Sequence, residues 1–440
     1  MKEGGVFTPI RVYKLEEMTN QEKKFLMERA KGNIVEIKDK IKPVLENVQA
    51  RGDEALLEYT KKFDGFSLEK SQIKITEKEI DTAFENTEPE TLKAIEEQIK
   101  LSKKFAEMQI KDNDWQREVI PGLNLGQKTT PIDIVGLYVP GGTAPLPTVM
   151  QILGVPAKIA GVKRIIACTP PREDMNPMLV AARLSGVDEV YRIGGAQAIA
   201  AMAYGTETIP KVRKIVGPGN IYVTAAKELV FGEVSIDMPA GPSEALIIAD
   251  DSANPVFVAA DILARAEHDT NAAGVLVTDN EELAKSVVEE IGKQKTSLPR
   301  QKIINGSLQK YSGIVLVKNQ KEAVEFANEY AAEHLEILTK NPWETMKGIE
   351  NAGSIFLGEN APVAVGDYAS GVNHVLPTGG NARMFSAVGV ETFQKKSEFE
   401  FLTKEGLAEL KKIVDPIARL EGLEAHRRSV EIRFEGEKNE

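Results

Sequence analysis

Residues 131–170 read PIDIVGLYVPGGTAPLPTVMQILGVPAKIAGVKRIIACTP and carry the clearest signal of the fold. An apolar run at 132–139 is followed by a glycine turn, a helical stretch at 148–160 and a second apolar run at 164–168. Near-continuous apolar strands joined by a helix are typical of parallel sheets that are covered on both faces. Four prolines and a glycine pair interrupt the uncharged part of this stretch, so we interpret it as a buried soluble segment and not as a membrane span.

The same alternation of apolar runs and helical stretches continues along the chain. It predicts further strands at 189–193, 214–216, 245–249, 274–278, 313–317 and 354–357. Helices are expected between them at 177–184, 196–203, 220–229, 255–267, 281–292 and 321–333. Because a second series begins after Ala240, the pattern predicts an α/β fold with two parallel lobes. The N-terminal region and the chain from Phe393 onward are interpreted as charged helical extensions.

Length and composition narrow the class of protein. A chain of 440 residues with 42% hydrophobic and 28% charged residues is typical of a globular protein with two or three domains. The net charge of −11 argues against a general nucleic-acid or anionic-membrane surface, since both need a basic face. The single cysteine, Cys168, cannot form an intramolecular disulfide, and residues 1–17 lack the apolar core of a signal peptide. We therefore expect a cytoplasmic protein.

Three glycine-bearing turns follow strands in the first lobe: VPGGTAP at 139–145, IGGAQ at 193–197 and VGPGN at 216–220. Glycine lets the backbone approach a ligand, and a helix that starts there directs free N–H groups at a phosphate. Turns between strands and helices also use glycine for packing, and neither GxGxxG nor GxxxxGK(S/T) occurs in the chain. The pattern therefore leaves a dinucleotide site and tight packing as alternatives.

The chain has only four histidines, and each has an acidic residue within a few positions. An imidazole can bind a metal or act as a base near neutral pH, and a carboxylate can orient it or complete a metal shell. Because helical histidine–glutamate pairs are more often solvated surface pairs, spacing alone does not decide between these alternatives. The four groups are Ala-Glu-His at 266–268 and Glu333-His334, both expected to end helices, Asp367 with His374, and Glu421 with His426.

Long ordered matches make the chain similar to the histidinol dehydrogenase family. They run in family order from residue 136 to residue 426 and are GLYVPGGTAP, IGGAQAIAAMAYGTETIPKV, KIVGPGNIYVTAAK, DMPAGPSEALIIADD, AEHD, EHLEI, GDYASGVNHVLPTGG and EGLEAH. The resemblance implies an NAD-dependent enzyme that oxidises L-histidinol through an enzyme-held aldehyde, L-histidinal, to L-histidine in two hydride transfers, the final step of histidine biosynthesis. It also implies a zinc ion that holds the substrate and a homodimer with shared active sites.

The resemblance also implies how the chain divides. Two incomplete Rossmann-like lobes would be flanked by helical N-terminal and C-terminal extensions. The implied parts are an N-terminal helical segment at 1–31, a discontinuous first α/β domain at 32–137 plus 243–388 with the acid–base residues, a second α/β domain at 138–242 on the NAD side, and a helical or extended arm at 389–440 that contributes to the partner's site.

Roles carried over by matching motif fall into three groups. Tyr138, Gln197 and Asn220 would contact NAD. His334 would take the alcohol proton, with Glu333 as its partner in activating water. Substrate contacts are implied for Ser243, His268, His334, Asp367, His374, Glu421 and His426. Zinc would be held by His268, Asp367 and His426, and both Glu421 and His426 would come from the partner subunit.

One residue departs from the family pattern at the implied zinc site. Arg265 stands in RAEH where the family has a glutamine ligand in QAEH, and a guanidinium has no lone pair for a metal. Either Arg265 points away and histidinol oxidation is intact, or it binds the carboxylate or sulfonate of another alcohol substrate. Thr148 and Gln151 also differ from the family on the substrate side. The alternative outside enzymes is a catalytically silent NAD-binding relative, and the retained Glu333-His334 pair speaks against it.

Overall fold

The computed structural model describes residues 10–29, 34–110, 114–141, 146–239 and 241–435. The chain divides into two compact units. The first comprises Met1–Gln109 and Ile132–Phe393, and the second comprises Ile110–Pro131 and Gln394–Glu440. Because the first unit contains two separate parallel sheets, the predicted α/β fold with two parallel lobes is confirmed.

One lobe of the first unit is built on a five-stranded parallel sheet in the order β6-β5-β4-β7-β8. Its strands are β4 (Ile134–Tyr138), β5 (Arg164–Cys168), β6 (Glu189–Tyr191), β7 (Lys214–Val216) and β8 (Ser235–Ile236). Helices α6 (Pro147–Ile159), α7 (Asn176–Ser185), α8 (Gly195–Tyr204) and α9 (Ile221–Val230) alternate with them. Strand order reverses between β4 and β7, where open α/β sheets bind ligands.

Four helices from the N-terminal region complete this lobe: α2 (Ile34–Arg51), α3 (Asp53–Tyr59), α4 (Glu77–Asn86) and α5 (Pro89–Gln109). Val48 of α2 lies in one buried cluster with Ile199 of α8, and Ile95 of α5 lies in another with Leu153 of α6. The structure therefore groups these helices and β4 with the five-stranded sheet, whereas the sequence-based division placed 32–137 with 243–388. An amphipathic helix needs an apolar surface to cover, and its own sequence does not encode which sheet offers it.

The other lobe is built on a six-stranded parallel sheet in the order β1-β11-β10-β9-β12-β13. The strands are β1 (Arg11–Lys14), β9 (Glu244–Ala249), β10 (Ala273–Thr278), β11 (Gly313–Leu316), β12 (His334–Leu338) and β13 (Ser354–Leu357). Every residue of β9 and β10 is buried, which explains their continuous apolar sequence. The helices are α1 (Asn20–Glu28), α10 (Pro255–Ala266), α11 (Glu281–Gln294), α12 (Gln301–Lys310), α13 (Gln320–Tyr330), α14 (Pro342–Met346) and α15 (Val363–Tyr368).

Two strands of this sheet were not predicted. The helix expected at 321–333 ends at Tyr330, because Ala331 adopts a left-handed conformation with φ 51°, and His334 then begins β12. The prediction that Glu333-His334 ends a helix was therefore wrong. Alanine, leucine and glutamate favour helices in isolation, but pairing with β9 and β13 on both sides overrides that preference. The second missed strand, β1, lies at the sheet edge in the segment expected to be helical.

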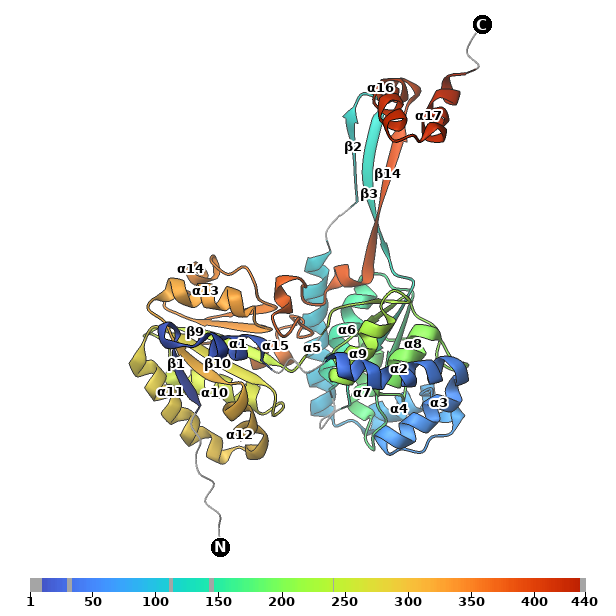
Figure 1. The fold of residues 1–440 in the computed structure, drawn as a ribbon. Helices are drawn as coiled ribbons and strands as arrows, with labels where there is room; N and C mark the ends of the chain where they lie inside the picture. Colours follow the sequence, from blue (N-terminus) through green and yellow to red (C-terminus); the bar gives the residue numbers. More distant parts are fainter. Residues whose placement is uncertain (1–9, 30–33, 111–113, 142–145, 240, 436–440) are drawn as a thin grey trace. The chain divides into compact units, whose positions relative to one another are not determined.

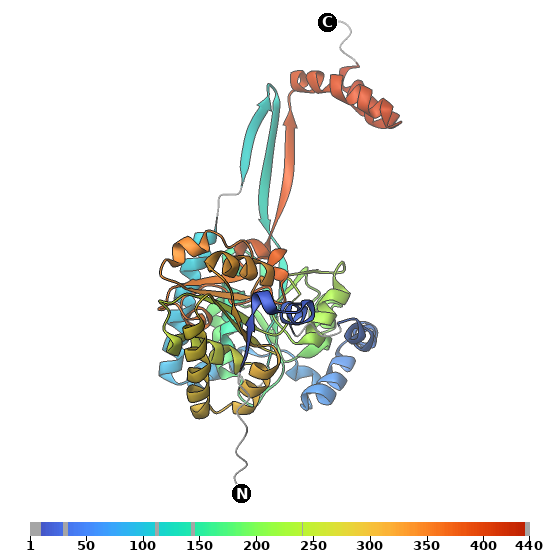
Figure 2. The ribbon, with the colours of Figure 1, turned by 60° about the vertical axis from the view of Figure 1, so that its left-hand side comes forward.

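The second unit contains a three-stranded antiparallel sheet followed by two helices. Strands β2 (Trp115–Ile120), β3 (Leu123–Pro131) and β14 (Gln394–Leu402) lie side by side in both views, with β3 in the middle (Figures 1 and 2). Helices α16 (Lys404–Leu420) and α17 (Glu424–Glu431) follow. The helical interpretation from Phe393 onward was thus wrong for β14, whose largely exposed residues give no buried apolar run to recognise.

Single turns complete the secondary structure. They are the 3₁₀ segments Leu15–Glu17, Lys70–Gln72, Lys295–Ser297, Asn381–Arg383, Val390–Phe393 and Ile432–Phe434, and the π turn Thr60–Asp64. Within the described ranges no helix is both long and apolar enough to cross a membrane. Within the stretch 131–170, the described residues form β4, α6 and β5.

Candidate active site

The candidate site lies at the amino ends of β9 and β12, two neighbouring strands in the middle of the six-stranded sheet. His334 pairs in register with Ala245, so the residues just before each strand, Ser243 and Glu333, come together. The Ser243 hydroxyl donates a hydrogen bond of 2.7 Å to Oε2 of Glu333, and the Glu244 N–H donates another of 2.8 Å to the same oxygen. The sheet register therefore builds the first half of the site from sequence-distant segments.

His334 is buried and holds a defined orientation. Its Nδ1 lies 3.1 Å from the carbonyl oxygen of Glu244 and 3.3 Å from Oε2 of Glu333. A backbone carbonyl can only accept a hydrogen bond, so Nδ1 carries a proton and Nε2 of the neutral ring carries the lone pair. Nε2 lies 3.6 Å from Oδ1 of Asp367 and has no hydrogen-bond partner among the described residues. The ring thus offers an open basic nitrogen.

The charges around His334 favour its cationic form. Burial and the Arg265 guanidinium act to lower the pKa of His334, but the Glu333 and Asp367 carboxylates outweigh them, and the net shift is upward. Burial likewise opposes ionisation of Glu333, whereas His334 and Arg265 bring the net pKa of Glu333 below its usual value. A neutral imidazole here therefore accepts a proton more readily than a free one.

Arg265 points into the site. It lies in the last turn of α10, and its side chain is only 4% exposed. One guanidinium nitrogen, Nη1, donates to the Ser243 hydroxyl at 2.5 Å, and Nη2 lies 3.6 Å from Oδ2 of Asp367. Burial opposes ionisation of Asp367, but His334 and Arg265 hold its pKa well below the usual range. We considered two orientations for Arg265, away from the site or into it, and the structure shows the second.

Two further histidines expected at the site have different surroundings. Nε2 of His374 is buried without a described hydrogen-bond partner, and burial lowers the pKa of this residue, with Asp367 acting in the opposite direction. His268 follows α10 and keeps much of its surface exposed. The protein atoms around its ring and the charge of Arg265 nevertheless lower the pKa of His268 to about 4. Both rings are therefore neutral near pH 7.

The three residues expected to contact NAD lie in the other lobe, beside the loops that follow its strands. The Tyr138 hydroxyl accepts a hydrogen bond of 3.1 Å from the Gly195 N–H, and the Gln197 amide donates one of 3.4 Å to Asp64. Asn220 caps α9, because its Oδ1 accepts from the N–H groups of the second and third residues of the turn, both at 3.1 Å. Each of these side chains thus has a structural contact in addition to any contact with a cofactor.

Two of the glycines in these turns are required by packing. A Cβ atom on Gly217, whose φ is 138°, would lie 2.1 Å from the carbonyl oxygen of Tyr138. A Cβ on Gly194 would lie 2.3 Å from the Pro170 ring. The packing alternative therefore holds at both positions. The remaining turn, 139–145, is only partly described, since residues 142–145 lie outside the described ranges.

The last two expected site residues belong to the second unit. Glu421 follows α16 and His426 lies in α17, and both are exposed. The contacts within the first unit therefore join five of the expected residues directly, namely Ser243, Arg265, Glu333, His334 and Asp367.

Sequence reasoning missed three carboxyl groups and one cation near these residues. Glu244 is an acid at the start of a buried strand, which is a usable signal, and Arg29 gives none. Asp261 of α10 and Glu336 of β12 are hydrogen-bonded to each other, and burial raises the pKa of both. The acid inside the run HLEIL was also a usable signal, because a buried carboxyl group needs a partner.

Comparison with known proteins identifies the family of this chain. A family model described as histidinol dehydrogenase matches residues 27–434. Histidinol dehydrogenase of Methanothermobacter thermautotrophicus is 50% identical over 412 residues, which cover 93% of this chain and 96% of that protein. The chain belongs to the histidinol dehydrogenase family. The enzyme of that name from Methanococcus maripaludis is 47% identical and covers 96% of this chain and 99% of its own length. The crystal structure of histidinol dehydrogenase from Elizabethkingia anophelis aligns with a TM-score of 0.92 at 38% identity, covering 98% of this chain and all of that one.

Histidinol dehydrogenases are NAD-dependent oxidoreductases that also use zinc. The five-stranded lobe fits a dinucleotide, because the strand order reverses between β4 and β7, and Tyr138 ends β4 while Asn220 lies in the loop after β7. The zinc donors fit less well. One oxygen of Asp367 faces Arg265 and the other faces His334, and no group of three histidine, cysteine or acidic residues is poised for a metal within the described ranges. Within the first unit, the described side chains therefore do not form a zinc site by themselves.

Proposed function

We propose that the chain oxidises L-histidinol to L-histidine through L-histidinal, with two molecules of NAD. The observation that carries this proposal is the hydrogen bonding of His334. Its Nδ1 donates to the carbonyl oxygen of Glu244, while Nε2 has no hydrogen-bond partner among the described residues. An alcohol oxidation needs such a base at the moment when hydride leaves the carbinol carbon. The match to the family over residues 27–434 supports histidinol as the alcohol.

The first step uses His334 Nε2 as the acceptor of the alcohol proton. The O–H bond breaks, a C=O bond forms, and the carbinol C–H pair leaves as hydride. NAD, when bound, supplies the hydride acceptor. Glu333 stabilises the imidazolium that forms, because its Oε2 lies 3.3 Å from Nδ1. Since Glu333 is held by two other donors, the ring keeps its orientation while its charge changes.

The second step requires water and the same base. A water molecule adds to the aldehyde carbon as a base takes one of its protons, and the aldehyde oxygen gains a proton, which gives a hydrate. Loss of one hydroxyl proton and a second hydride from the hydrate then gives the carboxylic acid, which releases a further proton to become the carboxylate. The overall balance is alcohol, water and two NAD⁺ giving acid, two NADH and protons. The buried pair Glu333–His334 serves both steps, because in each step a proton moves from an oxygen atom to Nε2 of His334.

The remaining expected site residues are proposed to hold the substrate. Asp367 is an anion and suits the substrate amine, while Ser243 and the neutral rings of His268 and His374 suit its imidazole. Glu421 and His426 are proposed to reach this site from a second copy of the chain. The second unit that carries them exposes Ile413, Ile417, Leu420 and Leu423, and a homodimer would cover such a surface. A cytoplasmic location is part of this proposal.

The position of Arg265 supports a second candidate function. A buried guanidinium with one nitrogen 3.6 Å from a carboxylate can exchange that partner for an anionic substrate group. The alcohol would then be a carboxylated or sulfonated one, oxidised by the same base. The silent-relative alternative has no such supporting contact.

The deciding experiment compares the two alcohols on the purified protein. With histidinol and NAD we expect two NADH formed per histidinol consumed, and histidine as the product. A chain that forms no NADH with histidinol but turns over an anionic diol would move the assignment to the second candidate. No turnover of either alcohol, with NAD still bound, would support the silent relative.

A further inference from the structure

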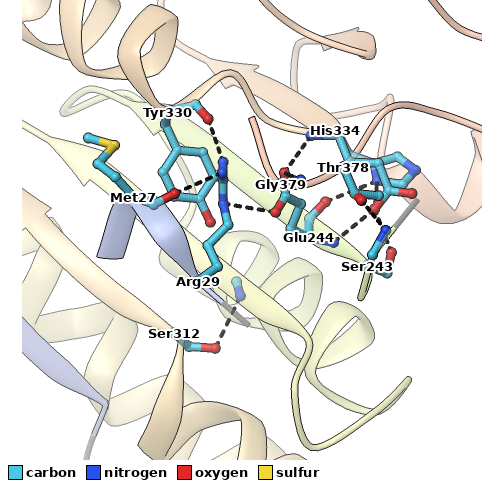
Figure 3. A network of polar contacts seen from close by, with 12 residues as sticks. Met27, Arg29, Ser243, Glu244, Ser312, Tyr330, His334, Thr378 and Gly379 are labelled. Carbon is cyan, nitrogen blue, oxygen red and sulfur yellow. Dashed lines mark hydrogen bonds and ion pairs between the residues drawn. The ribbon is translucent and has the colours of Figure 1, made fainter. Parts of the chain in front are cut away.

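Arg29 is buried in the six-stranded lobe although it lies in the N-terminal segment. Its side chain is 4% exposed, and its guanidinium carbon lies 3.4 Å above the centre of the Tyr330 ring. Nη1 donates to the carbonyl of Met27 at 3.1 Å, and Nη2 donates to the carbonyl of Tyr330 at 2.5 Å (Figure 3). The cation is thus held in place on three sides before its ionic partner is considered.

The ionic partner of Arg29 is Glu244, the first residue of β9. Arg29 Nε lies 2.8 Å from Oε2 of Glu244, and the Glu244 side chain is 3% exposed. The backbone of Arg29 has φ 51°, a conformation that non-glycine residues rarely adopt. A buried arginine held in an unfavourable backbone conformation indicates that its side-chain contacts outweigh the strain.

Glu244 contacts both members of the acid–base pair. Its Oε1 accepts from the Glu333 N–H at 3.2 Å and from the Gly379 N–H at 3.1 Å, and Figure 3 shows Gly379 beside it. Its own N–H donates to Oε2 of Glu333, and its carbonyl oxygen lies 3.1 Å from Nδ1 of His334. Glu244 therefore contacts both the backbone and the carboxylate of Glu333, and its carbonyl oxygen fixes the tautomer of His334.

A carboxylate in this place needs a counter-charge. Burial raises the pKa of Glu244 to about 7, while Arg29 opposes the rise and Glu333 adds to it. A protonated Glu244 would lose its ion pair and weaken its grip on two N–H donors, because a neutral oxygen accepts more weakly than an ionised one. Arg29 is the cation in direct contact with it in the described chain.

We propose that the Arg29–Glu244 ion pair is a positioning device for the acid–base pair Glu333–His334. Glu244 holds the Glu333 backbone and the His334 ring, and Arg29 favours the ionised form of Glu244 and holds its side chain in place. Neither residue touches the reacting atoms. The inference rests on the proposed function for its kinetic readout, and on the His334 tautomer for a readout that needs no substrate.

The kinetic test uses Arg29→Met, Arg29→Lys and Glu244→Gln in the full chain. Arg29→Met and Glu244→Gln should lower kcat by about tenfold or more, as the loss of a supporting contact around a reacting group typically does. KM for NAD should stay within about twofold, because NAD is expected in the other lobe. Arg29→Lys keeps the positive charge but loses the planar guanidinium with its several N–H donors, so it should give an intermediate kcat.

Lys23→Met is the matched control. Lys23 of α1 pairs with Glu329 of α13 at 2.7 Å, so it joins the same N-terminal segment to the same helix, but on the surface. Its removal should leave kcat unchanged. A loss of kcat in Lys23→Met equal to that in Arg29→Met would show that only the attachment of the segment matters, and would overturn the positioning role.

Nitrogen-15 NMR of labelled histidine provides the substrate-free readout. The chain has four histidines, so the His334 signal can be assigned by its loss in His334→Gln. In the parent we expect a protonated Nδ1, and in Glu244→Gln and Arg29→Lys a shifted signal from that nitrogen. Should the parent form no NADH with histidinol, the proposed function fails while this spectrum still tests the inference. Should Arg29→Met not fold, Arg29→Lys decides: parental kcat and an unmoved His334 signal refute the proposal.

Discussion

Nη2 of Arg265 lies 3.6 Å from Oδ2 of Asp367, so a buried cation already faces the carboxylate that the family resemblance assigns to zinc. A metal ion at that carboxylate would share it with a guanidinium that cannot lose its charge. We therefore expect the charge of Arg265 to affect both metal binding and the choice of substrate.

We first predict the metal content of Arg265→Gln. The parent should bind zinc weakly, because like charges repel and the arginine offers no lone pair. Glutamine removes the charge and supplies an oxygen donor, so the variant should hold more zinc per chain after extensive dialysis. Mass spectrometry of the two proteins, purified in parallel, measures the ratio. A full equivalent of tightly bound zinc in both would show that Arg265 does not affect the site.

The second prediction concerns His334→Gln. Removing a positioned general base typically costs roughly 10²–10⁴-fold in rate, and kcat with histidinol should fall within that range. The fold should persist, since glutamine can still donate a hydrogen bond from this position. NADH formation in a single turnover measures the chemical step, and the affinity for NAD serves as the control. A variant with parental kcat would remove His334 from the mechanism.

The third prediction is the pH dependence of kcat/KM. The base must be neutral to act, and the net effect of Glu333 and Asp367 raises the pKa of His334. Activity should therefore fall as pH drops through that raised pKa, with a midpoint above the ordinary value of about 6.5. Glu333→Gln removes one of the raising charges and should move the midpoint of the residual activity downward. An upward movement would contradict the assignment of this limb to His334.

The fourth prediction separates the two roles of Asn220. Asn220→Ala removes the cap of α9 and should cost about 1 kcal/mol of unfolding free energy. Asn220→Asp keeps a capping oxygen but adds a negative charge where NAD phosphates are expected. It should leave the melting temperature near the parental value and raise KM for NAD. Equal KM values for NAD in both variants and the parent would leave capping as the sole role of Asn220.

The fifth prediction tests whether two copies of the chain share each active site. His334→Gln and His426→Gln should each be inactive alone. In a mixed dimer one site carries both substitutions and the other carries none, so coexpression should restore about a quarter of parental activity, since about half of randomly paired dimers are mixed. Mixtures that stay inactive would place His426 and His334 of the same chain in one site, or outside it.

The sequence predicted strands correctly where polar residues flank a short, buried apolar run. Strand β5 at Arg164–Cys168 was predicted to the residue, because four of its five positions are buried and polar residues flank it. Strand β12 was missed because its sequence favours a helix and only its pairing partners make it a strand. Strand β14 was missed because nearly all its residues are exposed and most are polar, although Phe399 and Phe401 alternate with glutamates.

The sequence indicated which residue types belong to the candidate site but not which of them contact one another. Motif resemblance named Glu333, His334 and Asp367, and the structure places their side chains in contact. The Arg29–Glu244 pair was not foreseen, because a long sequence separation hides an ion pair that only the folded sheet creates. The orientation of Arg265 was open for the same reason, since a helix end can direct a long side chain either way.

The burial of Arg29 has a consequence for how the protein is made. Residues 10–29 leave the ribosome early, yet β1 pairs with Gly313–Leu316 and Arg29 packs on Tyr330, which are synthesised much later. The N-terminal segment must therefore wait, unpaired, through most of translation. Contacts of such long sequence separation slow folding and leave an apolar sheet edge exposed meanwhile. Enzymatic activity can thus emerge only after β11 has been made and has paired with β1, and after Tyr330 is available to Arg29.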